Sequence, residues 1–298
     1  MYDILIIGAG PAGLTAALYA LRANKKVLIL EAKSYGGQIL KASKIENYPG
    51  IKLISGYDYA TNLYNQVIEL NGEIKYETVL RVDADKTVTT NKSTYQAKSV
   101  IIATGSDNRK LNIDGENEFV GKGVSYCATC DGNFFRNKTI AVIGGGNSAF
   151  QDAIYLSDIA SKVYLIHRRD EFRADEKEQD IVSKSNNIML ITNAVINKII
   201  GDDFVKQIEI NKDGNISTLD VDGIFISIGQ EPKNNVFSNI VELDKLGYII
   251  SEDGVHTKTP GIYVAGDTRQ KELRQLTTAV SDGSIAATIA IREMNNNK

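Results

Sequence analysis

The only two cysteines of the chain, Cys127 and Cys130, are separated by two residues, and Asp131 follows directly behind them. Four kinds of chemistry could use this pair: a zinc site, a structural disulfide, two inert thiols or a redox-active dithiol. A zinc ion normally takes four ligands, and the only histidines, His167 and His256, are distant in the sequence. A disulfide across two residues closes too short a loop to stabilise a fold much through chain entropy.

A redox-active dithiol fits the spacing best. Two intervening residues let both sulfur atoms meet at the start of a helix, where the helix dipole favours a thiolate. Such a pair works by thiolate attack and mixed-disulfide exchange. Asp131 is placed to supply the proton that a departing thiolate needs, or else it only caps the following helix. The residues alone leave two inert thiols, and either role of Asp131, open.

The elements around this pair include an internal repeat. Residues 3–31 and 139–167 superpose without a gap, so that Gly8 falls on Gly144. Each copy reads as an apolar strand, a glycine-rich turn, an amphipathic helix and a second apolar strand. This pattern is typical of a nucleotide-binding βαβ unit, in which the phosphates lie at the positive end of the helix dipole. The alternative, tight helix packing without a ligand, is weakened because the pattern occurs twice in register.

Each turn supplies residues for contact with a cofactor. The first glycine makes the tight turn, the second lets the backbone approach a pyrophosphate, and the third position lets the helix pack against the strand. These residues are Gly8, Gly10, Pro11, Ala12 and Gly13 in the first copy and Gly144, Gly146, Asn147, Ser148 and Ala149 in the second.

The two copies differ at the end of the second strand. The first copy ends in Glu31, whose carboxylate can bind both ribose hydroxyls of FAD or NAD and would repel a 2′-phosphate. The second copy has His167 at this place, followed by Arg168, Arg169 and Arg173. Guanidinium groups bind a phosphate in a forked, charge-assisted way, so this copy suits NADPH. A solvated basic surface loop is the alternative.

Further candidates lie in loops and at strand ends outside the two copies. Residues 32–60 contain glycines and polar side chains typical of loops over a cofactor, although an ordinary surface connection has the same composition. Apolar strands at 98–106 and 261–268 end in small or acidic residues, and an amphipathic helix over 281–294 follows. The residues selected here are Gly36, Gly37, Gln38, Asn47, Ala103, Thr104, Gly105, Gly266 and Asp267.

The order of these segments predicts an α/β fold of two Rossmann-like domains. Residues 1–114 and 247–298 would form a discontinuous domain that binds FAD. Residues 115–246 would form a domain that binds NADPH, carries the cysteine pair and is inserted into the first. The polar stretches around Gly115 and Gly247 would act as hinges.

Composition limits the possible partners. The net charge of −3 at pH 7 leaves no bulk basic field for nucleic acid or anionic lipid. No apolar run approaches the ~18 residues that span a bilayer, and the chain begins with a strand pattern rather than a signal peptide. We therefore expect a cytoplasmic protein with no nucleic-acid or membrane partner and no metal site. In that compartment thiols are kept reduced, so a purely structural disulfide would be unusual.

Taken in order, these motifs resemble the low-molecular-weight bacterial thioredoxin reductases over nearly the whole chain. The resemblance rests on the first glycine fingerprint and on "GGQ", "ENYPG", "ATG", "CATCDG", "GGGNSA", "HRRDEFRA" and "AGD". It implies a homodimer with FAD and NADPH as cofactors and thioredoxin as protein partner. It also implies that Cys130 lies nearest the flavin, that Cys127 attacks the thioredoxin disulfide, and that Asp131 donates and accepts the proton.

Two positions depart from the family pattern. The family commonly has Arg-Gln-Ala before the C-terminal helix, where this chain has Arg274, Gln275 and Leu276, so flavin contacts there are expected with altered packing. The family often has Trp before the Pro of "ENxPG", where this chain has Tyr48. Some relatives accept electrons from ferredoxin and lack the NADPH motifs, whereas this chain keeps both.

The resemblance predicts an enzyme in which NADPH reduces FAD, FAD reduces the cysteine pair, and the pair reduces thioredoxin. Because the pair and the nicotinamide both need the flavin ring, we expect the inserted domain to rotate between half-reactions. Two alternatives remain: a flavoprotein disulfide reductase that serves another redoxin, and a flavin-bound redox sensor without turnover.

Overall fold

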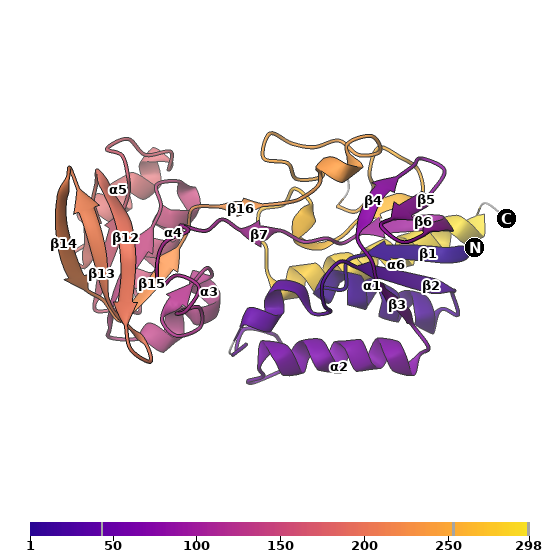
Figure 1. Ribbon diagram of the computed structural model, residues 1–298, viewed down its shortest axis with the longest axis horizontal. Coiled ribbons are helices and arrows are strands. Elements are labelled where there is room, and N and C mark those ends of the chain that lie inside the picture. Colours follow the sequence, from indigo (N-terminus) through magenta and orange to yellow (C-terminus); the bar gives the residue numbers. More distant parts are fainter. Residues whose placement is uncertain (43, 252–253, 297–298) are drawn as a thin grey trace. The chain divides into compact units, whose positions relative to one another are not determined.

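A computed structural model describes residues 1–42, 44–251 and 254–296. The chain divides into two compact units (Figure 1). Unit 1 consists of Met1–Asp107 and Glu231–Lys298, and unit 2 of Asn108–Gln230. The chain enters and leaves unit 2 through β7 (Asp107–Asn108) and β16 (Gln230–Glu231), which pair as a two-stranded sheet.

Unit 1 is built on a seven-stranded sheet with the order β3-β2-β1-β6-β5-β4, in which β17 also pairs with β6. The strands β1, β2, β3, β6 and β17 are parallel, and β4 and β5 form an antiparallel extension. The strands are β1 (Tyr2–Ile7), β2 (Val27–Glu31), β3 (Glu73–Tyr76), β4 (Val79–Val82), β5 (Thr87–Thr90), β6 (Thr94–Ile102) and β17 (Ile262–Val264).

The alternation of β1 divides the core of unit 1 between the two faces of this sheet. Ile4 and Ile6 pack against one face, whose cluster includes residues of the helices α1, α2 and α6. Leu5 and Ile7 pack on the opposite face, beneath the 3₁₀ helix η3. The bounds are α1 (Pro11–Arg22), α2 (Gly56–Glu69), α6 (Leu276–Asn296), and the 3₁₀ helices η1 (Gly37–Lys41), η3 (Asn235–Phe237) and η4 (Gly266–Thr268).

The sequence of α1 explains where it begins and how closely it packs. Pro11 occupies the first turn, where its missing N–H has no intrahelical partner to lose. Alanines then dominate the buried side of α1, and α6 contributes Ala286, Ala287 and Ala290 to the same cluster. Small side chains let the two helices approach. A Cβ added at Gly283 of α6 would lie 2.2 Å from the carbonyl oxygen of Ala12, so the approach requires glycine there.

Unit 2 repeats the parallel architecture and adds an antiparallel sheet. Its five-stranded parallel sheet has the order β11-β10-β9-β15-β8, and β12, β13 and β14 form a meander. The strands are β8 (Val124–Ser125), β9 (Thr139–Ile143), β10 (Lys162–Ile166), β11 (Ile188–Ile191), β12 (Ala194–Gly201), β13 (Val205–Lys212), β14 (Asn215–Asp220) and β15 (Gly223–Ile226). The helical segments are α3 (Ala128–Asp131), the 3₁₀ helix η2 (Gly132–Phe135), α4 (Asn147–Ser157) and α5 (Glu176–Lys184).

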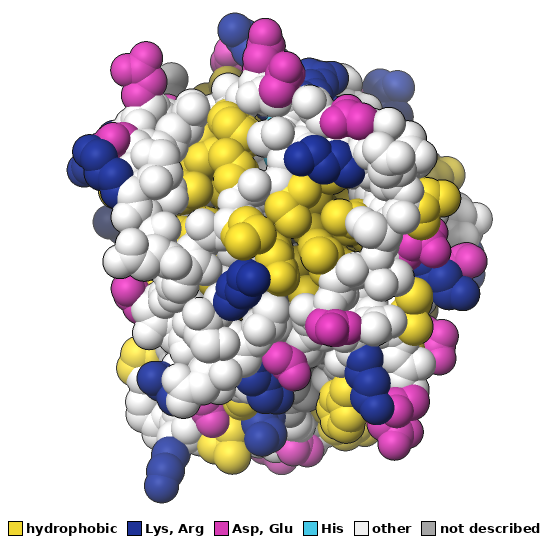
Figure 2. Space-filling model, turned by 90° about the vertical axis from the view of Figure 1, so that its left-hand side faces the viewer, with side chains coloured by type: hydrophobic (Ala, Val, Ile, Leu, Met, Phe, Trp, Pro, Cys, Tyr) yellow, Lys and Arg dark blue, Asp and Glu magenta, His cyan; other side chains and the backbone are white. Residues whose placement is uncertain are grey.

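The side of unit 2 that carries the β12–β14 meander has apolar side chains gathered among lysines and arginines (Figure 2). Exposed apolar residues of this unit include Met189, Val195, Phe204 and Ile216. None of them belongs to the residues selected from the sequence as a site.

The predicted domain limits, 1–114 with 247–298 and 115–246, differ from the limits of the two units. Leu111 and Ile113 pack against the core of unit 2, so that unit begins earlier than Gly115. Phe237 and Ile240 are buried in the core of unit 1, so unit 2 ends well before residue 246. The glycines were therefore poor markers of the boundaries, because tertiary packing of apolar side chains sets them.

The predicted C-terminal helix is confirmed but begins earlier than expected, at Leu276 rather than 281. Within the residues that the structure covers, no helix is long and apolar enough to cross a membrane.

Candidate active site

The two cysteines are joined as a disulfide at the start of a helical turn. Cys127 is the N-cap of α3, which leads directly into η2, and Cys130 lies in the same turn with its Cα 5.3 Å from that of Cys127. The parallel strand β8 ends two residues before Cys127 and delivers the chain to this turn. The short spacing thus brings both sulfur atoms together at a helix start, as the sequence predicted.

Asp131 completes α3, and its carboxylate faces Ser125 at the end of β8. The Ser125 hydroxyl donates a hydrogen bond of 2.6 Å to Asp131 Oδ2. Burial raises the pKa of the Asp131 carboxyl, and the hydrogen bond from Ser125 opposes that rise. Asp131 makes no side-chain cap for the following η2. The geometry therefore does not support the alternative in which Asp131 only caps a helix.

Ser125 and Glu116 form hydrogen bonds with the residues that lead into the cysteine pair, and the sequence pattern indicated neither of them. The backbone N–H of Cys127 donates to Ser125 Oγ at 3.0 Å. Glu116 is fully buried and accepts a hydrogen bond from the Tyr126 hydroxyl at 2.7 Å. The same carboxylate accepts from the backbone N–H groups of residues 111 and 112 at 3.0 and 2.7 Å. Glu116 is thus a buried carboxylate with three hydrogen-bond donors, and it fixes Tyr126, the residue before Cys127.

The glycine turn of unit 1 connects β1 to α1. Gly8 has φ of +107°, which only glycine adopts readily, and a Cβ at Gly13 would lie 1.9 Å from the Gly8 carbonyl oxygen. A Cβ at Gly10 would meet nothing within 4 Å, so the backbone there is open to a ligand. Glu31 accepts hydrogen bonds from Ala9 N through Oε2 and from Lys33 N through Oε1, each at 2.8 Å. Each carboxylate oxygen retains a lone pair for a ribose hydroxyl.

A second part of unit 1 presents a buried carboxylate after β17. Asp267 lies in η4 and forms an ion pair with Lys271, whose Nζ lies 3.3 Å from Oδ1. No described residue makes a hydrogen bond to this oxygen. Burial raises the pKa of the Asp267 carboxyl against the opposing effect of Lys271. A buried acceptor without a donor suits a hydroxyl group, such as one on the sugar chain of FAD. Asp267 therefore fits the predicted role.

Asp282 of α6 accepts hydrogen bonds from the segment that carries Asp267, and the sequence pattern did not indicate it. Its Oδ2 accepts from Gly266 N at 3.0 Å, from Arg269 Nε at 2.9 Å and from Lys271 Nζ at 3.0 Å. Burial would raise the pKa of Asp282, but the donors from Arg269 and Lys271 hold it below its ordinary value. A carboxylate inside an alanine-rich helix face was the available signal.

The remaining selected residues of unit 1 fall into two groups. Asn47 Nδ2 donates to Gln275 Oε1 at 3.2 Å, which joins two predicted contacts distant in sequence. Gln38 donates to Asp107 at 2.6 Å, and the Arg274 guanidinium lies over the Tyr248 ring at 3.9 Å. The others lie in the turns already described: Pro11 and Ala12 at the start of α1, Gly37 in η1, Ala103, Thr104 and Gly105 after β6, Gly266 before Asp267, and Leu276 at the start of α6.

The glycine turn of unit 2 connects β9 to α4 with the same geometry. Gly144 has φ of +154°, and a Cβ there would lie 2.4 Å from the Ser227 carbonyl oxygen. A Cβ at Gly146 would again meet nothing within 4 Å. Asn147 exchanges two hydrogen bonds with Asp175, which fixes the first residue of α4. Ser148 is exposed at the mouth of this turn and Ala149 is buried behind it.

The basic residues of unit 2 lie beside this turn. A Cβ at Gly145 would fall 2.3 Å from the His167 ring, so that ring covers the turn. Burial lowers the pKa of His167, and the positive charges of the three arginines lower it further. Arg173 donates its backbone N–H to the Gly145 carbonyl oxygen at 2.8 Å. In the described part of the chain the exposed guanidinium groups of Arg168, Arg169 and Arg173 form no ion pair, so they fit a phosphate.

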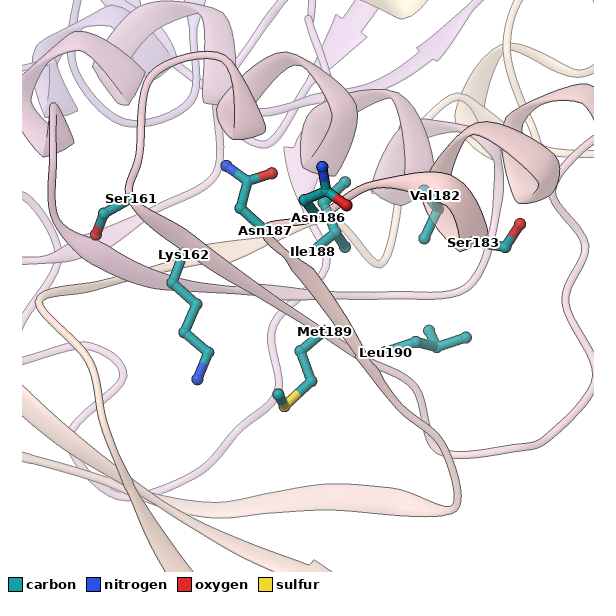
Figure 3. Close-up of a pocket in the computed structure, with 9 residues that line it drawn as sticks. All are labelled: Ser161, Lys162, Val182, Ser183, Asn186, Asn187, Ile188, Met189 and Leu190. Carbon is teal, nitrogen blue, oxygen red and sulfur yellow. The ribbon is translucent and has the colours of Figure 1, made fainter.

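A cavity of about 480 Å³ lies elsewhere in unit 2, between α5 and β11 (Figure 3). Its lining includes Lys162, Val182, Asn187 and Met189, and it contains no residue of the predicted site. Among the residues that the structure describes, no group of three or more His, Cys, Asp or Glu side chains could hold a metal ion.

The class of protein follows from comparison with known families. The family model of the pyridine nucleotide-disulphide oxidoreductases matches residues 2–283. This match spans both glycine turns and the cysteine pair.

Individual relatives narrow the class. The chain is 43% identical over 292 residues to the thioredoxin reductase of Treponema pallidum, covering 96% of this chain and 95% of that protein. A crystal structure of thioredoxin reductase from Streptococcus pyogenes superposes with a TM-score of 0.95 at 42% identity, covering 99% of both chains. The structure of Lactococcus lactis thioredoxin reductase in its FR conformation superposes with a TM-score of 0.66 at 42% identity, covering 98% of both. The chain belongs to the pyridine nucleotide-disulphide oxidoreductase family, within its thioredoxin reductases. Membership implies FAD and NADPH as cofactors, and the residues described above fit both.

Proposed function

We propose that the protein transfers two electrons from NADPH through FAD and the Cys127–Cys130 pair to the disulfide of thioredoxin. One observation carries the proposal: the disulfide and Asp131 share a single helical turn, in a chain with two nucleotide-type glycine turns. We assign FAD to unit 1, where Glu31 ends the second strand, and NADPH to unit 2, where the arginines lie exposed. A bound flavin supplies the conversion of hydride transfer into two-electron disulfide chemistry.

The chemistry of the reduced pair requires distinct roles for the two sulfur atoms. The Cys127 thiolate attacks one sulfur of the thioredoxin disulfide, which forms a mixed disulfide and releases one thioredoxin thiolate. Asp131 in its protonated form supplies the proton to that thiolate. The Cys130 thiolate then attacks Cys127, which restores the Cys127–Cys130 disulfide and releases the second thioredoxin sulfur as a thiolate. That thiolate takes a proton from solvent, so thioredoxin leaves as a dithiol. The enzyme pair is oxidised by two electrons and thioredoxin is reduced by two.

We further propose NADPH rather than NADH as the donor. Among the described residues, Arg168, Arg169 and Arg173 have no carboxylate partner that would compete with a ligand, and a forked contact to a 2′-phosphate requires available guanidinium groups. Glu31 at the equivalent place of unit 1 has both oxygens on backbone N–H groups, and its charge would repel such a phosphate.

A rotation of unit 2 between half-reactions and a homodimeric, cytoplasmic enzyme complete the proposal. The two solved relatives have the same 42% identity to this chain but superpose on it with TM-scores of 0.95 and 0.66, and the second is described as an FR conformation. This supports motion between the units in the family. Covalent cross-linking of the two units should allow one half-reaction and stop repeated turnover. A cross-linked enzyme with unchanged turnover would contradict the rotation.

The decisive test separates the two halves of the electron path. NADPH is added to the anaerobic FAD-loaded protein, flavin bleaching is followed, and oxidised thioredoxin is then added. We expect bleaching followed by reoxidation. Cys130→Ser should still bleach with NADPH but lose reoxidation by thioredoxin. A Cys130→Ser protein that reoxidises at the normal rate would contradict the proposed path.

The same assay distinguishes the alternatives. If a glutaredoxin-like acceptor restores the flavin with a higher kcat/KM than thioredoxin, the protein is a reductase for another redoxin. If no disulfide acceptor stimulates NADPH oxidation, the protein is a redox sensor, and Cys130→Ser would leave its behaviour unchanged.

A further inference from the structure

The hydroxyl of Ser125 donates a hydrogen bond to the Asp131 carboxylate from the end of β8. The residue is 5% exposed at the end of β8 and is paired with Phe225 of β15. Its Oγ lies 2.6 Å from Asp131 Oδ2 and receives the N–H of Cys127 at 3.0 Å. A third atom, the carbonyl oxygen of Cys127, lies 3.3 Å away within hydrogen-bonding distance.

These three contacts give the hydroxyl two complete arrangements. When Asp131 is ionised, the hydroxyl donates its single hydrogen to Oδ2 and accepts from Cys127 N. When Asp131 is protonated, the carboxyl donates to Oγ through a second lone pair, and the hydroxyl hydrogen turns to the Cys127 carbonyl oxygen. A hydroxyl is both donor and acceptor, so neither state leaves a buried polar group unpaired.

Among the residues that the structure describes, no charged side chain shifts the pKa of Asp131. Burial and the Ser125 hydrogen bond are the two causes that shift its pKa. The strands β8 and β15 and the helix η2 carry no titratable side chain in their described residues. The neighbouring helix α4 carries Asp152 and Tyr155, and Asp152 accepts a hydrogen bond from Ser227 instead.

We propose that Ser125 is a positioning residue that lets Asp131 release and regain its proton during disulfide exchange, by reversing its own hydrogen bond. The inference rests on the proposed function, in which Asp131 gives a proton to the departing thioredoxin thiolate. As that proton leaves, the Ser125 O–H turns from the Cys127 carbonyl oxygen to the new carboxylate. The return of a proton from solvent reverses the turn, so no atom or charge is left over.

The test measures the protonation of Asp131 directly. Infrared difference spectra of the oxidised FAD-loaded protein are recorded against pH, and the carboxyl band of Asp131 is assigned by its loss in Asp131→Asn. Ser125→Ala removes a charge-assisted hydrogen bond from the ionised state and a weaker one from the neutral state. We therefore expect the midpoint of the band to move up by about one pH unit. The matched control Ser157→Ala, which removes a serine hydroxyl bonded to the Ile154 carbonyl oxygen, should leave the midpoint in place.

A second pair of variants guards against a folding defect. Thr and Val have nearly the same shape and both suit a strand, so Ser125→Thr and Ser125→Val differ chiefly by the hydroxyl. The Thr variant should keep the midpoint near that of the parent protein, and the Val variant should move it upward as Ala does. Equal midpoints in the parent and in whichever of the Ala and Val variants folds would overturn the proposal.

A kinetic measurement links the midpoint to turnover. The pH profile of flavin reoxidation by thioredoxin should move in Ser125→Ala in the same direction as the infrared midpoint. If thioredoxin proves not to be the acceptor, the infrared titration still reports on Ser125, so failure of the proposed function and failure of this inference are distinguishable.

Discussion

The two glycine turns share a positive φ at the first glycine and an open backbone at the second, but they carry different side chains. Gly8 and Gly144 both lie at positive φ, and a Cβ at the second glycine of either turn would meet nothing within 4 Å. The third position is Gly13 in unit 1 but Ala149 in unit 2. The glycines thus give both turns an open backbone for phosphates, and we propose that the end of the second strand selects the nucleotide that binds.

The side chains at the two strand ends also differ in how far they are ordered before a nucleotide binds. Glu31 is fixed by two backbone N–H groups of its own unit. Arg168 and Arg169 are exposed and form no ion pair in the described chain, so their side chains lose conformational entropy only when a phosphate binds. Tight retention is thus expected in unit 1 and reversible binding in unit 2, as a resident cofactor and a substrate require.

The largest expected effect concerns the third position of the two turns. Gly13→Ala would place a Cβ 1.9 Å from the Gly8 carbonyl oxygen, and we expect it to lower the free energy of unfolding of unit 1 by about 3 kcal/mol. The reciprocal change Ala149→Gly should lower that of unit 2 by only about 1 kcal/mol. Urea unfolding of both variants tests the difference. Equal losses would show that the two turns are packed alike.

The arginines provide the next largest effect. A double variant with Arg168→Ala and Arg169→Ala should lower kcat/KM for NADPH roughly 30-fold, since a charge-assisted contact is worth about 2 kcal/mol. The kcat/KM for NADH should stay unchanged, because NADH lacks the 2′-phosphate. Lys177→Ala, which removes an exposed positive charge from α5, is the matched control. Equal losses of kcat/KM with NADPH and with NADH would mean that the arginines do not bind the 2′-phosphate.

A smaller effect is expected at Glu31. Glu31→Gln keeps one carbonyl acceptor but turns an amide N–H₂ toward the second backbone donor, which costs about 1 kcal/mol of unfolding free energy. The FAD dissociation constant of the variant should rise as well. His167→Gln in unit 2 should leave the FAD dissociation constant unchanged. A higher FAD dissociation constant in His167→Gln would contradict the assignment of FAD to unit 1.

The smallest effect is a change of titration at His167. Burial and then the neighbouring arginines hold the pKa of His167 below its ordinary value of 6.5. A lowered histidine pKa means that the folded state resists protonation, so stability is lost as the pH falls below the unfolded value. In proton NMR the midpoint of His167 should rise when Arg168 and Arg169 become Ala. The only other histidine is His256, so the resonance that disappears in His167→Gln is that of His167. An unchanged titration midpoint in the arginine variant would show that the arginines do not affect the pKa of His167.

Sequence periodicity was sufficient for the parts of the fold that are local. Both βαβ units and the disulfide turn follow from strand, glycine and helix patterns within about 30 residues. The unit boundaries could not be predicted in this way, because Phe237 and Ile240 lie in a largely polar stretch and are buried in the core on one face of the folded sheet of unit 1. Burial of that kind depends on contacts distant in sequence.

The candidate site could be proposed from the sequence where residue type and spacing together limit the chemistry. The two-residue spacing of the cysteines, the paired glycines and the clustered arginines do so. Ser125 and Asp282 were missed because their importance lies in the hydrogen bonds they form, to Asp131 and to Gly266. Serine and aspartate occur widely in turns and helices, so their types alone indicate no role. An acid on the buried face of a predicted helix was a usable signal for Asp282, whereas a serine two residues before the cysteine pair was a weak one.

The pairing of β7 with β16 has a consequence for how the chain folds. Arg109 N lies 3.0 Å from the Gly229 carbonyl oxygen, so the first and last residues of unit 2 are neighbours. Before unit 2 folds, the two pieces of unit 1 are separated by a loose loop of roughly 120 residues, whose closure costs on the order of 4 kcal/mol. Once unit 2 has folded, its two ends lie side by side, so the entropy of closing this loop no longer opposes the folding of unit 1. Folding of the inserted unit thus favours addition of the second piece of unit 1, which supplies β17 to the sheet and α6 to the core on one face of it.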